Sequence, residues 1–78
     1  MSEKHQSEEE EQMKRLKQIA LDSTSASTWK KVMETLATYG EKAIPVIADI
    51  IAESMEAEIR DYGLDVIKKI REKSTNTR

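Results

Sequence analysis

The chain has 78 residues, 37% of them hydrophobic and 36% charged, with a formal net charge of −2 and no cysteine. A chain of this length forms one small domain, whose core covers only about 60% of the surface that the unfolded chain exposes. The lack of cysteine excludes disulfides, zinc–thiolate sites and thiol catalysis. No apolar run could span a bilayer and no signal segment is visible, so we expect a cytoplasmic protein.

The first predicted element is a helix that follows a disordered acidic tail at residues 1–6. Ser7 with Glu10 three residues later is a capping box, which predicts that the helix begins there and runs to about Leu21. Small hydroxyl side chains fill the segment 22–27 and predict a turn. The apolar stripe of the helix has three- and four-residue spacing and comprises Met13, Leu16, Ile19 and Ala20.

A second helix is predicted from about Ala26 to Tyr39. Its apolar face comprises Trp29, Val32, Met33 and Leu36. Gly40 ends it, because glycine adopts the left-handed conformation after a helix without a Cβ clash. Tyr39 and Tyr62 are expected at the edge of the core with their hydroxyls in water.

The third helix, predicted from about Lys42 to Glu53, is apolar nearly all round. Pro45 fits its first turn, where the missing N–H loses no hydrogen bond. A helix without a polar face has to be covered on several sides, so we expect this one at the centre of the fold.

The fourth helix is predicted to begin after an N-cap at Ser54 and to end near residue 73, before a disordered tail at 74–78. Gly63 lies in its middle, where glycine costs about 1 kcal/mol relative to alanine, and this indicates a close approach by a neighbouring helix. The apolar stripe comprises Ile59, Gly63, Val66, Ile67 and Ile70. The predicted core of the whole domain comprises Leu36, Ile44, Ile47, Ile50, Ile51, Ile67 and Ile70.

The two halves of the chain repeat each other at a spacing of about 31 residues. Apolar positions then pair as Met13 with Ile44, Leu16 with Ile47, Ile19 with Ile50, Ala20 with Ile51, Met33 with Leu64, Leu36 with Ile67, and Tyr39 with Ile70. A period of this size, made of two helices and a short turn, is typical of an α-solenoid. We therefore predict an all-α fold of four helices, arranged as two stacked antiparallel hairpins at about 7–40 and 41–73. An ordinary four-helix bundle is the alternative.

The second half of the chain carries a characteristic set of residues: Gly40, Ala43-Ile44-Pro45, Ile47, Ile50, Ile51, and Ile59-Arg60 before Gly63. This pattern resembles a HEAT repeat, the helix pair of armadillo-type α-solenoids. The first half is more degenerate, with Lys14 at the proline position and Thr28-Trp29 in place of the hydrophobic–basic pair. The resemblance implies a scaffold that binds other proteins through the second helix of each pair, and it implies no catalysis.

The sequence contains no candidate catalytic, cofactor-binding or metal-binding set. His5 is the only histidine, and no convergent ligands at metal-site spacing accompany it. Asp61 and Asp65 are four residues apart, but Lys68 and Lys69 follow within reach and favour ordinary ion pairs on the helix surface. We therefore expect a protein that is not an enzyme and uses no cofactor.

The expected function is a protein–protein interaction module or small scaffold that binds through the second and fourth helices. The candidate partner-binding residues are Trp29, Lys30, Lys31, Glu34, Thr38, Arg60, Asp61, Asp65 and Lys68. Trp29 is either a packed core residue or an exposed anchor, and the sequence leaves both open. The alternative function is a nucleic-acid-associated regulator, which would use Lys30, Lys31, Lys68, Lys69, Arg71 and Lys73.

Two repeats are fewer than an α-solenoid usually needs, since each repeat buries its apolar face on its neighbours. Tyr62, Val66 and Ile70 are therefore expected to remain uncovered at the C-terminal edge. We predict a weak homodimer, or a complex with another protein, through that edge.

Overall fold

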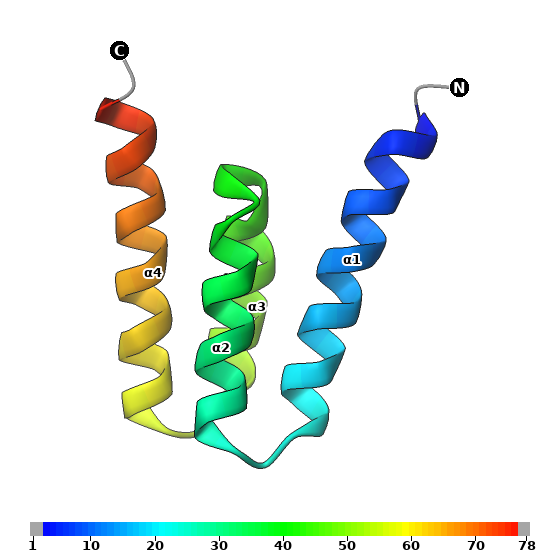
Figure 1. Ribbon diagram of the computed structural model, residues 1–78. Coiled ribbons are helices and arrows are strands. Elements are labelled where there is room, and N and C mark those ends of the chain that lie inside the picture. The colour runs from blue at the N-terminus through cyan, green and yellow to red at the C-terminus, as the bar shows by residue number, and fades with distance from the viewer. Residues whose placement is uncertain (1–2, 77–78) are drawn as a thin grey trace.

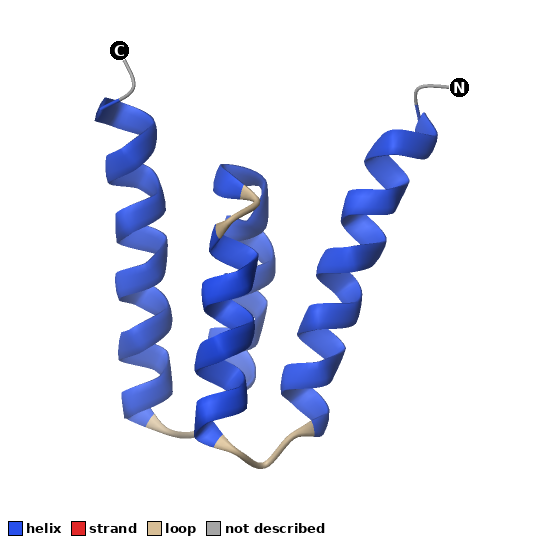
Figure 2. Cartoon of the chain, viewed as in Figure 1, coloured by secondary structure: helices blue, strands red, loops and turns tan. Residues whose placement is uncertain are grey.

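The computed structural model describes the backbone of residues 3–76 and the side chains of residues 8–73. Its elements are the helices α1 (Glu3–Asp22), α2 (Ala26–Ala37), α3 (Ile44–Glu53) and α4 (Ala57–Asn76), and the short 3₁₀ helix η1 (Gly40–Ala43). Residues 3–76 contain no strand (Figure 2). The prediction of an all-α fold is therefore confirmed.

The two outer helices are longer than predicted. α1 begins at Glu3, so that Ser7 lies inside the helix and is not its cap, and α4 runs to Asn76. Glutamate, glutamine and lysine, which favour helix, fill the start of α1, and acidic side chains there also complement the helix dipole. The outermost residues of the predicted tails, 1–2 and 77–78, lie outside the described residues.

The helix pair α2 and α3 occupies the centre of the molecule, with α1 on one side and α4 on the other (Figure 1). Both outer helices pack on both central helices, whereas α1 and α4 do not pack against each other within residues 3–76. The result is a slab with extents of 39 × 29 × 16 Å.

The core forms where the four helices meet. Its largest fully buried side chains are Met33, Leu36, Ile47 and Ile50, and further buried apolar residues are Met13, Ala20, Val32, Ala43, Ile59, Val66, Ile67 and Ile70. Of the predicted core, Ile44 and Ile51 are only half-buried, although both pack against it. The third helix is central as predicted, but its Ala48 and Ala52 face solvent.

Backbone chemistry sets the turn between α2 and α3. Gly40 has a φ of 80°, which is the left-handed conformation predicted from the sequence. η1 follows at once, and Pro45 occupies the first turn of α3, again as predicted.

Ser54 does not have its predicted role as the N-cap of α4. It ends α3 as its C-cap, and α4 begins only at Ala57. The buried hydroxyl accepts a hydrogen bond from the N–H of Glu56 and lies 3.2 Å from the carbonyl oxygen of the same residue, to which it donates. This local bond to the backbone is the alternative to capping that serine offers in a turn.

Burial does not follow the predicted pairing at 31 residues. Of the seven apolar pairs matched at that spacing, only Leu36 with Ile67 is buried at both positions. Ile19, which was predicted on the apolar stripe of the first helix, is 52% exposed, so this assignment is wrong. Leu64, the apolar match of the buried Met33, is 57% exposed. The helix boundaries still recur at a spacing of 31 residues, since α1 ends at Asp22 and α3 ends at Glu53. Successive side chains are about 100° apart around a helix, so a match of helix boundaries does not by itself match the buried faces.

α4 lies close to its neighbouring helices at Gly63, as predicted. A Cβ atom at this position would lie 2.6 Å from Cγ1 of Ile51 and 2.9 Å from Sδ of Met33. Because Ile51 belongs to α3 and Met33 to α2, the missing side chain lets α4 pack against both central helices at one point.

Replacement of Gly63 by alanine should therefore destabilise the domain. The overlap costs about 1–3 kcal/mol, which is more than the gain of about 1 kcal/mol in helix propensity. Urea unfolding followed by circular dichroism measures the difference. Leu64→Ala, at the exposed neighbouring position, is the control and should change stability by less than about 0.5 kcal/mol. A Gly63→Ala variant more stable than the wild type would contradict the close approach.

Candidate interaction surface

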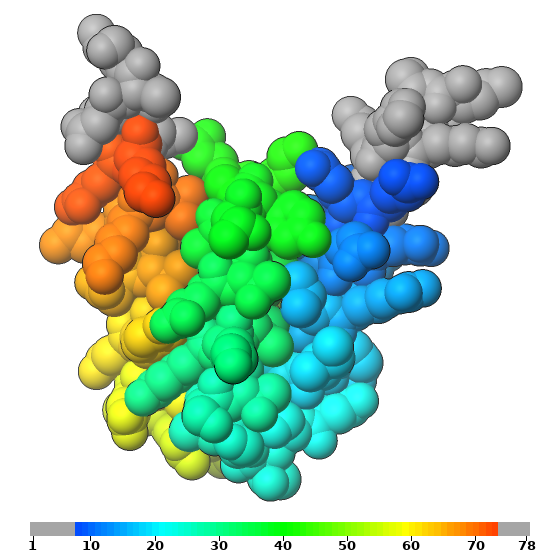
Figure 3. All heavy atoms as spheres, in the orientation of Figure 1, coloured from blue at the N-terminus to red at the C-terminus, as the bar shows by residue number. Residues whose placement is uncertain are grey.

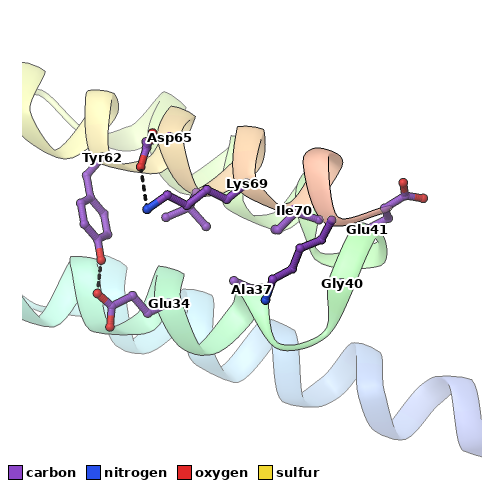
Figure 4. A pocket seen from close by; sticks show the side chains of 10 residues that line it. Glu34, Ala37, Gly40, Glu41, Tyr62, Asp65, Lys69 and Ile70 are labelled. Atoms are coloured by element: carbon purple, nitrogen blue, oxygen red, sulfur yellow. Dashed lines mark hydrogen bonds and ion pairs between the residues drawn. The ribbon is translucent and has the colours of Figure 1, made fainter. Parts of the chain in front are cut away.

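A groove of about 520 Å³ lies between α4 and the end of α2, where the chain turns into η1 (Figure 4). In the space-filling view of Figure 3, the side chains of α4 (yellow to red) lie beside those of α2 (green). The apolar part of its lining comes from Ala37, Val66 and Ile70. The remaining lining residues are Glu34, Gly40, Glu41, Tyr62, Asp65, Lys69 and Lys73.

The two walls of the groove differ in charge. Glu34 on α2 places a carboxylate on one wall, whereas the carboxylate of Glu41 on η1 points away from the groove (Figure 4). Lys69 and Lys73 come from the wall formed by α4, and Asp65 pairs with Lys69 at 3.3 Å. The groove therefore combines an apolar floor with a carboxylate on the α2 wall and a mainly basic α4 wall.

Tyr62 closes one end of the groove. Its ring packs half-buried against the core, and its hydroxyl, at an exposed position, donates a hydrogen bond to the carboxylate of Glu34 (Figure 4). This bond, together with burial and the negative charges of Glu34 and Asp65, raises the pKa of Tyr62 to about 12. The bond joins α4 to α2 across the groove.

Lys30 supports the same end from α2. Its Nζ atom lies 5.6 Å from the centroid of the Tyr62 ring, within the range of a cation–π contact. The same Nζ lies 2.8 Å from a carboxylate oxygen of Glu58, and this hydrogen bond and the lysine charge lower the pKa of Glu58. Lys30 is therefore engaged with α4 through two contacts.

The predicted partner-binding residues fall into three groups. Glu34 and Asp65 line the groove. Lys30, Lys31 and Glu34 line a second, shallower depression of about 390 Å³ with Ser27 and Thr28. The remaining exposed members lie outside both depressions and comprise Thr38, Arg60, Asp61 and Lys68.

Trp29, the ninth predicted residue, stabilises a turn. It is half-buried against the core, and its indole N–H donates to the carbonyl oxygen of Ser23 at 2.9 Å. This bond connects α2 to the segment that follows α1. Trp29 lines neither depression, so its position favours the packed role over that of an exposed anchor.

The predicted apolar edge is wrong for two of its three residues. Val66 is 8% exposed and Ile70 6% exposed, because both point toward the core rather than outward. The large exposed hydrophobic residue of α4 is Leu64. A homodimer through Val66 and Ile70 therefore has no structural basis.

Sequence analysis missed part of the groove. Glu41, Lys69 and Lys73 were absent from the expected partner-binding set, although the lysines were assigned to the nucleic-acid alternative. The two lysines could have been found from the sequence. Tyr62, Asp65, Lys69 and Lys73 are spaced by three and four residues, which places all four along one side of α4.

The described residues offer no group of three or more histidine, cysteine or acidic side chains that could hold a metal ion. The side chain of His5 lies outside them. None of the helices in this part of the chain combines the length and apolarity needed to cross a membrane.

Comparisons with protein-family models, curated proteins and solved structures find no match.

The titration of Tyr62 tests the bond that closes the groove. A raised pKa means that the folded state favours the neutral phenol, so this contribution to stability is present below about pH 10 and is lost as the pH rises through about 12. The tyrosinate absorbance of the wild type minus that of Tyr62→Phe should show a midpoint near 12. Glu34→Gln should move that midpoint down toward the ordinary value of about 10. An unchanged midpoint in Glu34→Gln would exclude the bond.

Trp29→Phe tests the structural role of the indole. The variant keeps an aromatic ring but removes the N–H, so we expect a loss of about 1 kcal/mol in unfolding free energy. Urea unfolding measures this loss, while the Tyr62 titration should keep its midpoint because the groove is untouched. Wild-type stability in Trp29→Phe would contradict the assigned hydrogen bond.

Proposed function

We propose that the chain is a non-catalytic protein-interaction module, built as two stacked HEAT-like hairpins and acting in the cytoplasm. The pattern of helix contacts supports this arrangement. α1 packs on α2 and α3 packs on α4, as within two hairpins, while α1 packs on α3 and α2 packs on α4, as between them. An up-and-down four-helix bundle would instead bring α1 against α4.

The binding surface in this proposal is the face that α2 and α4 share. The observation that carries it is the groove between these helices, which has an apolar floor and charged walls. Apolar surface at the centre with polar groups at the rim is the usual anatomy of a protein interface. The resemblance to HEAT repeats leads to the same two helices independently.

The nucleic-acid alternative receives less support from the surface. Lys30 is paired with Glu58, and Lys69 is paired with Asp65. The carboxylate of Glu34 lies on the opposite wall of the groove and would repel phosphates (Figure 4). The chain as a whole also carries a net charge of −2.

Affinity capture from a lysate of the source organism, read by mass spectrometry, tests the proposal with two matched variants. Ala37→Arg puts a long cationic side chain on the groove floor, and Ala52→Arg makes the same change at an exposed site on α3. We expect partner proteins that Ala52→Arg retains and Ala37→Arg loses, with both variants folded by circular dichroism. Equal capture by the two variants would contradict a binding site on the α2–α4 face, and capture abolished by nuclease would favour the nucleic-acid alternative.

A further inference from the structure

We infer that copies of this chain associate head to tail, with an exposed face of α1 in one copy packed antiparallel on an exposed face of α4 in the next. The α1 face comprises Glu11, Arg15, Ile19 and Asp22, and the α4 face comprises Arg60, Leu64, Lys68 and Arg71. All of these residues are exposed, and the members of each face are three or four residues apart, so they lie along one side of their helix. None of them lines the groove between α2 and α4, so the inference does not depend on the proposed function.

Each face has one large exposed hydrophobic side chain. Ile19 is 52% exposed and Leu64 is 57% exposed. Among the described residues the remaining large exposed hydrophobic side chain is Met55, which lies on the connection between α3 and α4. Contact between Ile19 of one copy and Leu64 of the next removes apolar surface of both from water, which favours association.

The charges at the ends of the two faces are opposite and equally spaced. Glu11 and Asp22 are eleven residues apart on α1, and Arg60 and Arg71 are eleven residues apart on α4. Both pairs therefore span about 16 Å at 1.5 Å per residue, so two ion pairs can form at once. Within residues 8–73 neither Glu11 nor Arg60 has an ion-pair partner. Exposed ion pairs add little affinity, but they select the partner surface and fix the register.

The hydrophobic residues set the antiparallel direction. Asp22 comes three residues after Ile19, and Arg60 comes four residues before Leu64. An antiparallel pairing of Asp22 with Arg60 therefore also brings Ile19 close to Leu64. A parallel pairing would keep two ion pairs but would separate the two hydrophobic residues by about one helical turn.

Two features keep the association weak. Arg15 and Lys68 come together in the antiparallel arrangement as a like-charge contact, although both side chains are long enough to turn their charged ends to water. Each face is also a single stripe on one helix, which is small beside the surface that a stable dimer buries. We therefore expect association only at high protein concentration.

The two faces cannot meet within one molecule. α1 and α4 lie on opposite sides of the central helix pair and do not pack against each other within residues 3–76 (Figure 1). A contact between two different faces is heterologous, and it leaves one face free at each end of the pair. Copies therefore add in rows and do not stop at a dimer.

Cross-linking of single-cysteine variants tests this arrangement, because the chain contains no cysteine of its own. Ile19→Cys and Leu64→Cys are mixed in equal amounts at high concentration and oxidised. We expect the mixed disulfide dimer in clear excess over both homodimers, and over the mixed product of Ile19→Cys with Thr35→Cys, an exposed control site on α2. A mixed product no larger than random collision gives would overturn the inference. An excess of the Leu64→Cys homodimer would also overturn it, in favour of a symmetric dimer.

Sedimentation measures the assembly without a cross-link. The average mass of the wild type should rise above its monomer mass of 8.9 kDa as the protein concentration increases. The double variants Arg60→Glu/Arg71→Glu and Glu11→Lys/Asp22→Lys should each stay monomeric, because one face then repels the other. Their equimolar mixture should associate again, since the reversed faces complement each other. Both variants should keep the circular dichroism of the wild type, because the replaced side chains are exposed.

Two controls separate this contact from other effects. Lys14→Glu/Lys31→Glu changes the net charge as much as Arg60→Glu/Arg71→Glu does, but at exposed positions outside both faces, so it should associate like the wild type. Ala37→Arg, which alters the groove of the proposed function, should also associate like the wild type. A wild type that stays monomeric at every concentration, or a mixture of the two face variants that does not associate, overturns the inference.

Discussion

The contact of Gly63 with Ile51 and Met33 is the constraint on which the rest of the fold depends. α1 and α4 do not support each other, so α4 is held by its packing on α2 and α3 alone. At Gly63 the backbone of α4 lies against the side chains of Ile51 on α3 and Met33 on α2. Val66 and Ile70, further along α4, are buried in the core. A side chain at position 63 would overlap the side chains of Ile51 and Met33, so part of this packing would have to shift. Tyr62 and Val66, on either side of Gly63 in α4, line the groove.

Polar contacts between helices act mainly on orientation. Lys17 pairs with Asp49 at 3.4 Å and Lys42 pairs with Glu9 at 2.6 Å, which connects α1 to α3 and to η1. These side chains are substantially exposed, and exposed ion pairs contribute about 0–1 kcal/mol each. The contacts of Tyr62 and Lys30 bring α4 to α2 at the end where both helices begin, so the groove stays open toward the other end, where Gly40 removes a side chain.

Residues with a strong backbone signal were predicted correctly from the sequence. The structure has the turn predicted at Gly40, the first-turn position predicted for Pro45 and the close approach predicted at Gly63. The face of each helix was harder to predict, because a repeat matched at 31 residues follows the helix boundaries and not the buried positions. Ile19 was therefore assigned to the wrong face. The groove depends on side chains from separate elements, and Glu41 carries no local signal that relates it to Lys69.

Burial of Val66 and Ile70 changes where a partner can act. Both side chains are turned inward, so α4 offers little apolar surface from Val66 and Ile70 at its C-terminal end. A chain of 78 residues has a small core, and these two residues are already part of it. A ligand that binds only the folded state stabilises it in proportion to the logarithm of its concentration above Kd. A partner that contacts both α2 and α4 would therefore stabilise the same packing of α4 that Gly63 permits, which couples binding to the stability of the domain.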